Sequence, residues 1–231
     1  MNRGVFVTGT DTGVGKTLVA CALLRALHAR GIDAGAMKPI ETGVGPGGPA
    51  DAIALRRAAG ERDPLADVCP QSFALGAAPA AAARAEGRAL DLGAIDAAYS
   101  RLRARRAFLV VEGAGGLLVP VAAELSMADL ARRFELPLLV VCRAALGTIN
   151  HTRLTLEAAR ARGISVAGVV ISHAGGALSA PDVANLEELR SELGAALAGE
   201  IPPLGAGELP APEHLNVEAL ISSGASGASK S

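Results

Sequence analysis

Residues 9–17 read Gly9-Thr10-Asp11-Thr12-Gly13-Val14-Gly15-Lys16-Thr17, and they lie between an apolar run at 5–7 and a helix pattern at 18–24. A strand, a glycine-rich turn and a helix that begins at Gly-Lys-Thr form the context that a phosphate-binding loop requires. Glycines let backbone N–H groups converge on one anion, and the helix N-terminus adds partial positive charge. The nucleotide contacts expected in this loop are Gly13, Val14, Gly15, Lys16, Thr17 and Leu18.

Two side chains of this loop have expected roles. Lys16 would reach the β- and γ-phosphates, and the Thr17 hydroxyl would ligate Mg²⁺. The usual pattern, G-x-x-x-x-G-K-[ST], places a glycine at position 10, whereas this chain has Thr10 there and Gly9 one place earlier. An ordinary glycine-rich turn is the alternative interpretation, but the agreement of strand, Gly-Lys-Thr and helix favours nucleotide binding.

The length and composition favour one domain with a large aliphatic core. The chain has 231 residues, of which 50% are hydrophobic but only 2% aromatic, and tryptophan is absent. Such a core of Ala, Val, Leu and Ile suits parallel strands covered by alanine-rich helices. We expect residues 1–221 to form the domain, and the Ser/Gly/Ala-rich residues 222–231 to be a disordered tail.

Charge and cysteine content exclude several classes of protein. A net charge of −1 gives no electrostatic case for binding nucleic acid or an acidic membrane. Cys21, Cys69 and Cys142 are far apart and lack C-x-x-C spacing, so neither a disulfide framework nor a zinc site is expected. No stretch has the length of a signal peptide or a membrane span. We therefore expect a cytoplasmic protein.

Apolar runs alternate with amphipathic stretches of helix length, which predicts an α/β fold. We expect a single-domain P-loop NTPase-like fold, with a mostly parallel central sheet flanked by helices. Strands are expected at 5–7, 32–37, 107–111, 136–142, 166–171 and 200–204, and helices at 18–24, 52–59, 92–105, 152–162 and 183–198. Ligands of such sheets bind beyond the carboxyl ends of the strands. The strand ends at Gly9, Lys38, Glu112, Arg143 and Ser172 should therefore converge on one crevice.

Lysine is rare in this chain, and two of its three occurrences lie near the N-terminus. Among 22 lysine and arginine residues, lysine stands at 16, 38 and 230, and Lys230 lies in the expected tail. Lysine is a compact, proton-tunable charge, which arginine is not. Biased codon usage explains one exception more easily than two, so we expect Lys38 to have a chemical role beside Lys16.

Two acidic residues stand at the borders of expected elements. Glu112 follows an apolar strand and precedes Gly113-Ala114-Gly115-Gly116, as the Mg²⁺-linked carboxylate of phosphate-loop enzymes does. Asp51 precedes the helix pattern at 52–59 and is expected to cap it. A solvated strand end is the alternative interpretation of Glu112, and the glycines behind it disfavour that alternative.

Taken together, the phosphate loop, Lys38-Pro39, Asp51, residues 112–116 and Leu146-Gly147-Thr148-Ile149-Asn150-His151 resemble the dethiobiotin synthetase family. The resemblance runs from residue 5 to about residue 204, which is most of the chain. It implies ATP- and Mg²⁺-dependent carboxylation and ring closure of 7,8-diaminononanoate with CO₂, through a carbamate and a carbamic–phosphoric anhydride. The products are dethiobiotin, ADP and phosphate. The resemblance also implies a homodimer.

The resemblance also implies roles for individual residues. Lys38 and Lys16 would be catalytic, and Thr17, Asp51 and Glu112 would bind Mg²⁺. Thr12, Lys38 and Thr42 would contact the diamine. The helix start Thr148-Ile149-Asn150 would bind its carboxylate from the partner subunit. Further ATP contacts would be Asp51, Glu112, Gly113, Ala114, Gly115, Ser172, His173, Pro202, Pro203 and Leu204.

One departure from the family concerns the nucleotide base. Many members have Asn-Asp where this chain has Ser172-His173, and that amide reads the adenine edge. A serine hydroxyl lacks the paired donor and acceptor of an amide. We therefore expect a weaker preference for ATP over other nucleotides.

Three other functions remain as alternatives. A partner-regulated ATPase of the partitioning or positioning type would have a signature lysine where this chain has Asp11. An amide-forming ligase of the cobyrinate type would bring a glutaminase domain, for which the chain has no room. A nucleotide-binding module without chemistry leaves Lys38, Asp51 and Glu112 unexplained.

Overall fold

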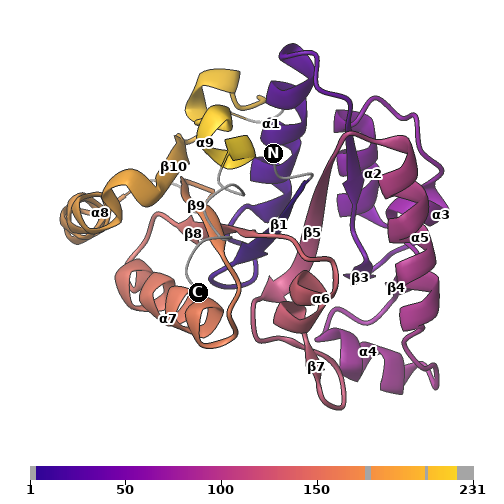
Figure 1. The fold of residues 1–231 in the computed structure, drawn as a ribbon. Helices are drawn as coiled ribbons and strands as arrows, with labels where there is room; N and C mark the ends of the chain where they lie inside the picture. Colours follow the sequence, from indigo (N-terminus) through magenta and orange to yellow (C-terminus); the bar gives the residue numbers. More distant parts are fainter. Residues whose placement is uncertain (1–3, 175–177, 206–207, 223–231) are drawn as a thin grey trace, which may run out of the picture.

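A parallel six-stranded sheet forms the centre of the molecule in the computed structural model, which describes residues 4–174, 178–205 and 208–222 (Figure 1). The strand order is β10-β9-β8-β1-β5-β2, with every neighbouring pair parallel. The strands are β1 (Gly4–Gly9), β2 (Ala34–Met37), β5 (Phe108–Gly116), β8 (Leu138–Arg143), β9 (Val166–Ser172) and β10 (Leu197–Ile201). The expected α/β fold with a parallel central sheet is confirmed.

Two pairs of short strands stand apart from this sheet. β3 (Ile40–Thr42) pairs in parallel with β4 (Gln71–Phe73), and β6 (Pro120–Ala122) pairs antiparallel with β7 (Leu125–Ser126). The helices are α1 (Lys16–Ala29), α2 (Ala50–Ala58), α3 (Leu65–Val68), α4 (Pro79–Ala85), α5 (Leu92–Arg105), α6 (Met127–Arg133), α7 (Thr148–Ala161), α8 (Ala180–Leu193) and α9 (Val217–Ser222), with 3-10 turns at Gly194–Ala196 and Pro212–His214. None of the helices described combines the length and the hydropathy that crossing a bilayer requires.

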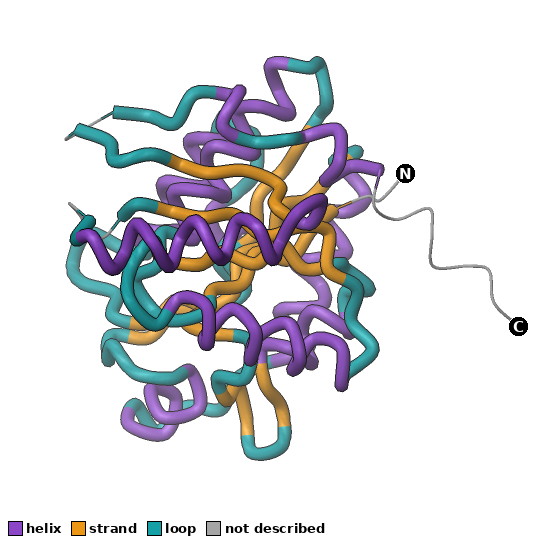
Figure 2. The backbone as a smooth tube through the Cα atoms, turned by 90° about the vertical axis from the view of Figure 1, so that its left-hand side faces the viewer, coloured by secondary structure: helices purple, strands orange, loops and turns teal. Residues whose placement is uncertain are grey.

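The two faces of the sheet carry separate hydrophobic cores. Along β1, Val5 and Val7 pack with residues of α1, α2 and α9, whereas Phe6 packs with residues of α5, α6 and α7. This alternation follows from the two-residue period of a strand. The strands run through the middle of the molecule with helices around them (Figure 2). The sheet is therefore buried on both faces, as a parallel sheet requires.

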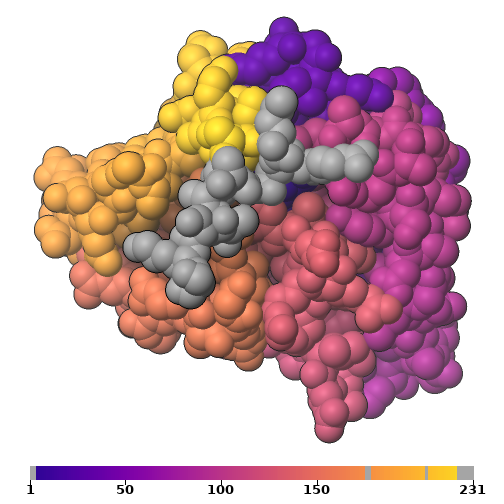
Figure 3. All heavy atoms as spheres, viewed as in Figure 1, coloured from indigo at the N-terminus to yellow at the C-terminus, as the bar shows by residue number. Residues whose placement is uncertain are grey.

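Two contacts fix helices at the periphery. Arg30 at the end of α1 forms an ion pair of 2.9 Å with Glu218 of α9, and these two helices lie side by side at the surface (Figure 3). In the core on the other face of the sheet, Tyr99 of α5 stacks on Phe134 with ring centroids 4.1 Å apart. The Tyr99 hydroxyl also donates to the Phe134 carbonyl at 3.0 Å, so α5 is bound to the end of α6.

The bounds predicted from the sequence agree with the structure for some helices and strands and differ for others. The helix expected at 92–105 has those bounds as α5, whose first turn is capped by Asp91 through the Ala94 N–H at 2.9 Å. The helix expected at about 183–198 is present as α8, but it begins at Ala180 and ends at Leu193, before Gly194, which has a φ of 47°. β10 ends at Ile201 instead of running over 200–204, since Pro202 and Pro203 have no N–H to donate.

The expected domain limits remain predictions. Ser222, which we placed in the tail, is the last residue of α9. The rest of the expected tail, 223–231, lies outside the described residues.

Candidate active site

The phosphate loop joins β1 to α1 as expected. Gly13 and Gly15 have φ values of 71° and 94°, in the left-handed region that glycine adopts without strain. α1 begins directly after Gly15. Lys16 is buried, and its ammonium donates to the Asp11 carbonyl at 3.1 Å, so it curls back over the loop. This is the placement that a phosphate-binding lysine requires.

The structure explains why glycine stands at position 9. A Cβ added to Gly9 would lie 2.5 Å from the Asp11 carbonyl oxygen and 3.0 Å from Lys16 Nζ. The N–H of Thr10 donates to the Val141 carbonyl at 2.9 Å. A side chain at position 9 would therefore clash with the backbone of Asp11 and crowd the Lys16 ammonium, and the backbone of Thr10 is held by the adjacent strand.

Lys38 lies between two carboxylates. Its ammonium donates to Glu112 Oε1 at 2.5 Å, to Asp51 Oδ2 at 3.0 Å and to the Gly113 carbonyl at 3.3 Å. Lys38 and Glu112 are buried, so these charges interact in a poorly solvated environment. Burial alone would lower the pKa of Lys38, but the charges of Glu112 and Asp51 outweigh it and raise that pKa. The structure thus brings three of the expected site residues together.

Glu112 lies within β5, beside Val7 of β1, and the strand continues to Gly116. Its Oε1 also accepts the hydroxyl of Thr17 at 2.9 Å. Its Oε2 is buried and has no hydrogen-bond partner among the described residues. A buried carboxylate oxygen without a partner is costly, so this atom marks a place where a ligand is expected to bind.

A cavity of about 350 Å³ surrounds these groups. It is lined by Thr12, Gly13, Gly15, Lys16, Thr17, Lys38, Glu41, Thr42, Asp51, Glu112, Ala114, Gly115 and Ala174. Burial and then the charge of nearby Lys38 lower the pKa of Lys16 below its ordinary value. Two ammonium groups therefore line one small cavity, which suits an anion with several charges.

Comparison with known proteins decides the family. A family model described as an AAA domain matches residues 3–208. The ATP-dependent dethiobiotin synthetase BioD of Anaeromyxobacter dehalogenans is 57% identical over 173 residues, which cover 75% of this chain and 78% of that protein. The protein of the same name from Bacillus licheniformis is 38% identical over 204 residues, covering 87% and 86%. The chain belongs to the dethiobiotin synthetase family.

A solved structure adds information about the fold. The signal recognition particle receptor FtsY of Elizabethkingia anophelis superposes with a TM-score of 0.50 and 15% identity. The match covers 95% of this chain and 65% of the FtsY chain. At this identity the likeness shows the α/β fold of P-loop NTPases and nothing about activity.

The expected capping role of Asp51 is wrong in this family member. α2 begins after Pro49, and Asp51 lies in its first turn. The N–H groups of Asp51 and Ala52 donate instead to Glu41, at 3.0 Å to Oε1 and 2.9 Å to Oε2. Burial alone would raise the pKa of Asp51, but Lys38 outweighs it and keeps that pKa below its ordinary value. Sequence reasoning missed Glu41, although a helix that starts after a proline signals that its cap comes from elsewhere.

Thr12 and Thr42 are among the residues that line the cavity around Lys38. Both also line a second cavity of about 430 Å³, whose far wall is Gly76, Ala77, Ala78 and Pro79. The N–H of Gly43 donates to the Leu75 carbonyl at 3.2 Å, which joins the loop after β3 to this wall. The segment 61–90, which the sequence left unassigned, therefore contributes to the surroundings of the site.

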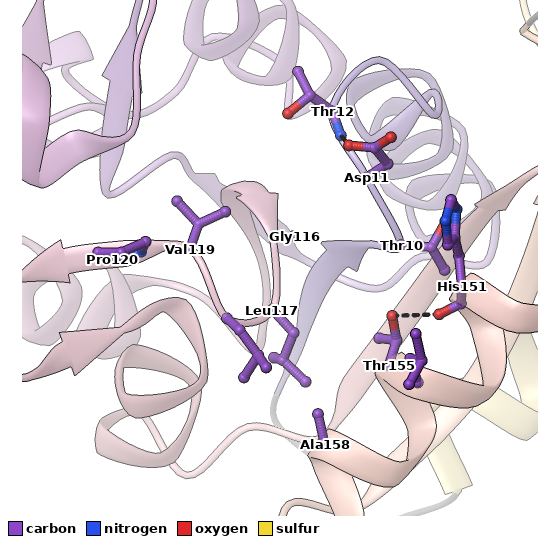
Figure 4. Close-up of a pocket in the computed structure, with 12 residues that line it drawn as sticks. Thr10, Asp11, Thr12, Gly116, Leu117, Val119, Pro120, His151, Thr155 and Ala158 are labelled. Carbon is purple, nitrogen blue, oxygen red and sulfur yellow. Dashed lines mark hydrogen bonds between the residues drawn. The ribbon is translucent and has the colours of Figure 1, made fainter.

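A third, largely apolar cavity of about 430 Å³ opens beside the phosphate loop (Figure 4). Thr10, Asp11 and Thr12 lie at one end, Leu117 and Val119 on another wall, and α7 contributes His151, Thr155 and Ala158. Thr12 thus borders all three cavities. Leu118 and Leu154, which also line this cavity, are 51% and 55% exposed.

The residues expected to bind the substrate carboxylate were assigned to the site of the partner subunit, and that role remains a prediction. Thr148, Ile149 and Asn150 form the first turn of α7, and none of them lines the cavity around Lys38. Thr148 lines a small cavity with Asp11 and Arg143, whose charged groups are 3.8 Å apart. Arg143 therefore lies on the outer side of the loop and not in the Lys38 cavity.

The residues expected near the base form a polar group at the end of β9. Ser172 is fully buried, and its Oγ would lie 2.4 Å from a Cβ on Gly15. His173 Nε2 lies 2.6 Å from Glu200 Oε1, and Glu200 also accepts from Arg190 at 2.7 Å. Pro202, Pro203 and Leu204 follow β10 in the same region. Their contacts with a nucleotide remain predictions.

Proposed function

We propose that this enzyme carboxylates 7,8-diaminononanoate with CO₂ and closes its ureido ring at the expense of ATP, giving dethiobiotin, ADP and phosphate. The observation that carries this proposal is the Lys38 ammonium, held 2.5 Å from Glu112 and 3.0 Å from Asp51 beside the phosphate loop. A partner-regulated ATPase has no need of that lysine. Membership of the synthetase family favours the ligase over that alternative.

Phosphate binding is assigned to the loop. Backbone N–H groups at the start of α1 and the Lys16 ammonium would hold the β- and γ-phosphates. Lys16 would leave the Asp11 carbonyl, which it contacts at 3.1 Å, to reach them. Gly113, Ala114 and Gly115 would form the opposite wall.

The protein offers Mg²⁺ a set of oxygen ligands. Glu112 Oε2 is buried without a described partner, and Thr17 and Asp51 line the same cavity. Such a set fits a hard divalent cation that also binds phosphate oxygens. The described residues contain no cluster of three His, Cys, Asp or Glu side chains around a metal position, which leaves the remaining ligands to phosphate and water. Bound Mg²⁺ would stabilise the charge on the transferring phosphoryl group.

The chemistry explains the two lysines. One amine of the substrate attacks CO₂ and loses a proton, which gives a carbamate. A carbamate oxygen then attacks the γ-phosphorus, and the bond to ADP breaks. The second amine attacks the carbamoyl carbon, closes the ring and expels phosphate. Lys16 and Lys38 would stabilise the negative charge that builds up at the carbamate and the phosphoryl group.

The substrate would extend from Lys38 past Thr12 and Thr42. Thr12 borders all three cavities, which supports a place for it between the diamine and the nucleotide. The mixed anhydride would hydrolyse if exposed, so this region has to exclude water during turnover.

A homodimer would complete the site. Leu118 and Leu154 line the apolar cavity and are 51% and 55% exposed, and exposed apolar side chains of this kind are typical of an interface. A second copy there would bring the start of its α7 to the diamine carboxylate, where helix N–H groups favour an anion. Analytical ultracentrifugation tests this proposal, because Leu118→Glu with Leu154→Glu should give a monomer.

The decisive experiment is phosphate release from MgATP and bicarbonate, with and without 7,8-diaminononanoate. Release that depends on the diamine, with dethiobiotin as product, is the expected result. ATP hydrolysis at the same rate with and without the diamine would contradict the proposal and favour a partner-regulated ATPase.

A further inference from the structure

Glu41 connects the strand after Lys38 to the helix that carries Asp51. Its carboxylate accepts the N–H of Asp51 at 3.0 Å and the N–H of Ala52 at 2.9 Å, and it is 5% exposed. We propose that Glu41 is a positioning residue, which holds Asp51 in place for Lys38 and for the metal. This inference rests on the metal role proposed above for Asp51.

The first turn of α2 lacks a cap of its own. Pro49 precedes the helix and has no side-chain acceptor. The second and third N–H groups of a helix are those that a capping side chain normally accepts. In α2 they belong to Asp51 and Ala52, and Glu41 accepts both with one carboxylate. An acceptor from another element therefore replaces the local cap.

This arrangement leaves the Asp51 carboxylate available. An aspartate in the first helical turn can bind the free N–H groups of its own helix. Here those groups are occupied by Glu41, and the Asp51 carboxylate accepts from Lys38 at 3.0 Å instead. The same capping contact also fixes the distance between α2 and the segment 38–42, because Lys38 and Glu41 belong to that segment.

The test separates positioning from simple capping. Glu41→Gln keeps the shape of the side chain, but its amide nitrogen cannot accept an N–H, so one of the two contacts is lost. Pro49→Ser, added to Glu41→Gln, supplies α2 with a local cap that lacks the link to residues 38–42. Asp91→Ala is the matched control, since it removes a cap from α5. Asp51→Asn tests the metal assignment itself.

Two measurements apply to each variant. The first is the urea midpoint of unfolding without nucleotide. The second is the dissociation constant of β,γ-methylene-ATP by calorimetry, with Mg²⁺ and with EDTA. The ratio of the EDTA value to the Mg²⁺ value reports the metal-dependent part of binding. We expect Glu41→Gln to lower this ratio about tenfold, as losing an outer contact of a metal ligand does. Asp91→Ala should lower the midpoint and leave the ratio unchanged, and Pro49→Ser should restore the midpoint of Glu41→Gln without restoring the ratio.

Other outcomes overturn the inference in distinguishable ways. If Glu41→Gln has the wild-type ratio of dissociation constants, or if adding Pro49→Ser restores that ratio fully, Glu41 only caps α2 and has no positioning role. If Asp51→Asn lowers the ratio of dissociation constants while Glu41→Gln leaves it at the wild-type value, this inference fails and the metal assignment stands. If Asp51→Asn keeps the wild-type ratio, the metal assignment of Asp51 fails, and the positioning role fails with it.

Discussion

Two clusters of carboxylates and cations in this protein each contain a buried carboxylate, and they differ in how completely their atoms are paired. In the scaffold cluster (Asp63, Asp67, Arg101, Arg105 and Arg106), Asp63 accepts from Arg106 at 2.9 and 3.1 Å, and Asp67 accepts from Arg101 and Arg105. In the Lys38 cluster (Lys38, Asp51 and Glu112), Glu112 Oε2 has no partner among the described residues. The scaffold cluster uses arginine forks, whereas the Lys38 cluster uses a lysine point charge beside a cavity. Incomplete pairing of a buried charge marks the place for a ligand, and complete pairing marks a scaffold.

The largest effect is expected for Lys38→Ala. Turnover should fall about 100- to 1,000-fold, because a buried cation aimed at developing negative charge is lost. Diamine-dependent phosphate release measures this on protein shown to be folded by its thermal midpoint. Arg105→Ala, in the scaffold cluster, is the control and should keep wild-type turnover. Comparable losses in both variants would break the distinction between the clusters.

Asp63→Ala should affect stability and spare catalysis. It leaves the Arg106 guanidinium buried with Asp33 as its remaining partner, so the free energy of unfolding should fall by about 3 kcal/mol. Urea denaturation measures the change, and kcat/KM should stay at the wild-type value. A variant as stable as the wild type would show that full pairing contributes little to the scaffold.

Two further unpaired atoms lie at the end of β9, where the nucleotide base is expected, and they extend the comparison between paired and unpaired polar groups. Ser172 Oγ and His173 Nδ1 are buried without partners among the described residues. A hydroxyl in place of an amide leaves the base with fewer contacts, so kcat/KM for CTP or GTP should lie within about tenfold of that for ATP, the value of one hydrogen bond. Steady-state kinetics with the three nucleotides decides it, and a much stronger preference for ATP contradicts it.

The smallest effect concerns pH. The pKa of Lys16 is lowered in the free enzyme by burial and by Lys38, whereas bound phosphates favour its charged form. Nucleotide binding therefore takes up a proton between the lowered pKa of Lys16 in the free enzyme and its higher pKa in the complex, and affinity should fall as pH rises through that range, by less than tenfold per pH unit. Calorimetric titration of ADP across that range measures it. Lys16→Arg, which keeps its charge, should bind with a flat pH profile, and a decline of the same slope would exclude Lys16 as its cause.

Sequence reasoning recovered the parts of this protein that local patterns encode. The phosphate loop, Lys38 and Glu112 stand next to apolar strands, and the rule that ligands bind beyond strand ends brings them together. The order of the strands and the cap from Glu41 depend on contacts across many residues, which no periodicity records. The wall at 76–79 was missed for the same reason, since proline and alanine there carry no chemical signal. Asp51 was assigned a local cap because its helix start was read without the preceding Pro49.

The stack of Tyr99 on Phe134 also determines how the protein can be observed. The chain has no tryptophan and a single tyrosine, so its tyrosine fluorescence comes from one ring between α5 and α6. Neither tyrosine nor tryptophan is among the described residues that line the Lys38 cavity or the cavity next to it. A tryptophan introduced at Leu118 would therefore emit without background from a second tryptophan, and its spectrum would report directly on what covers the apolar cavity.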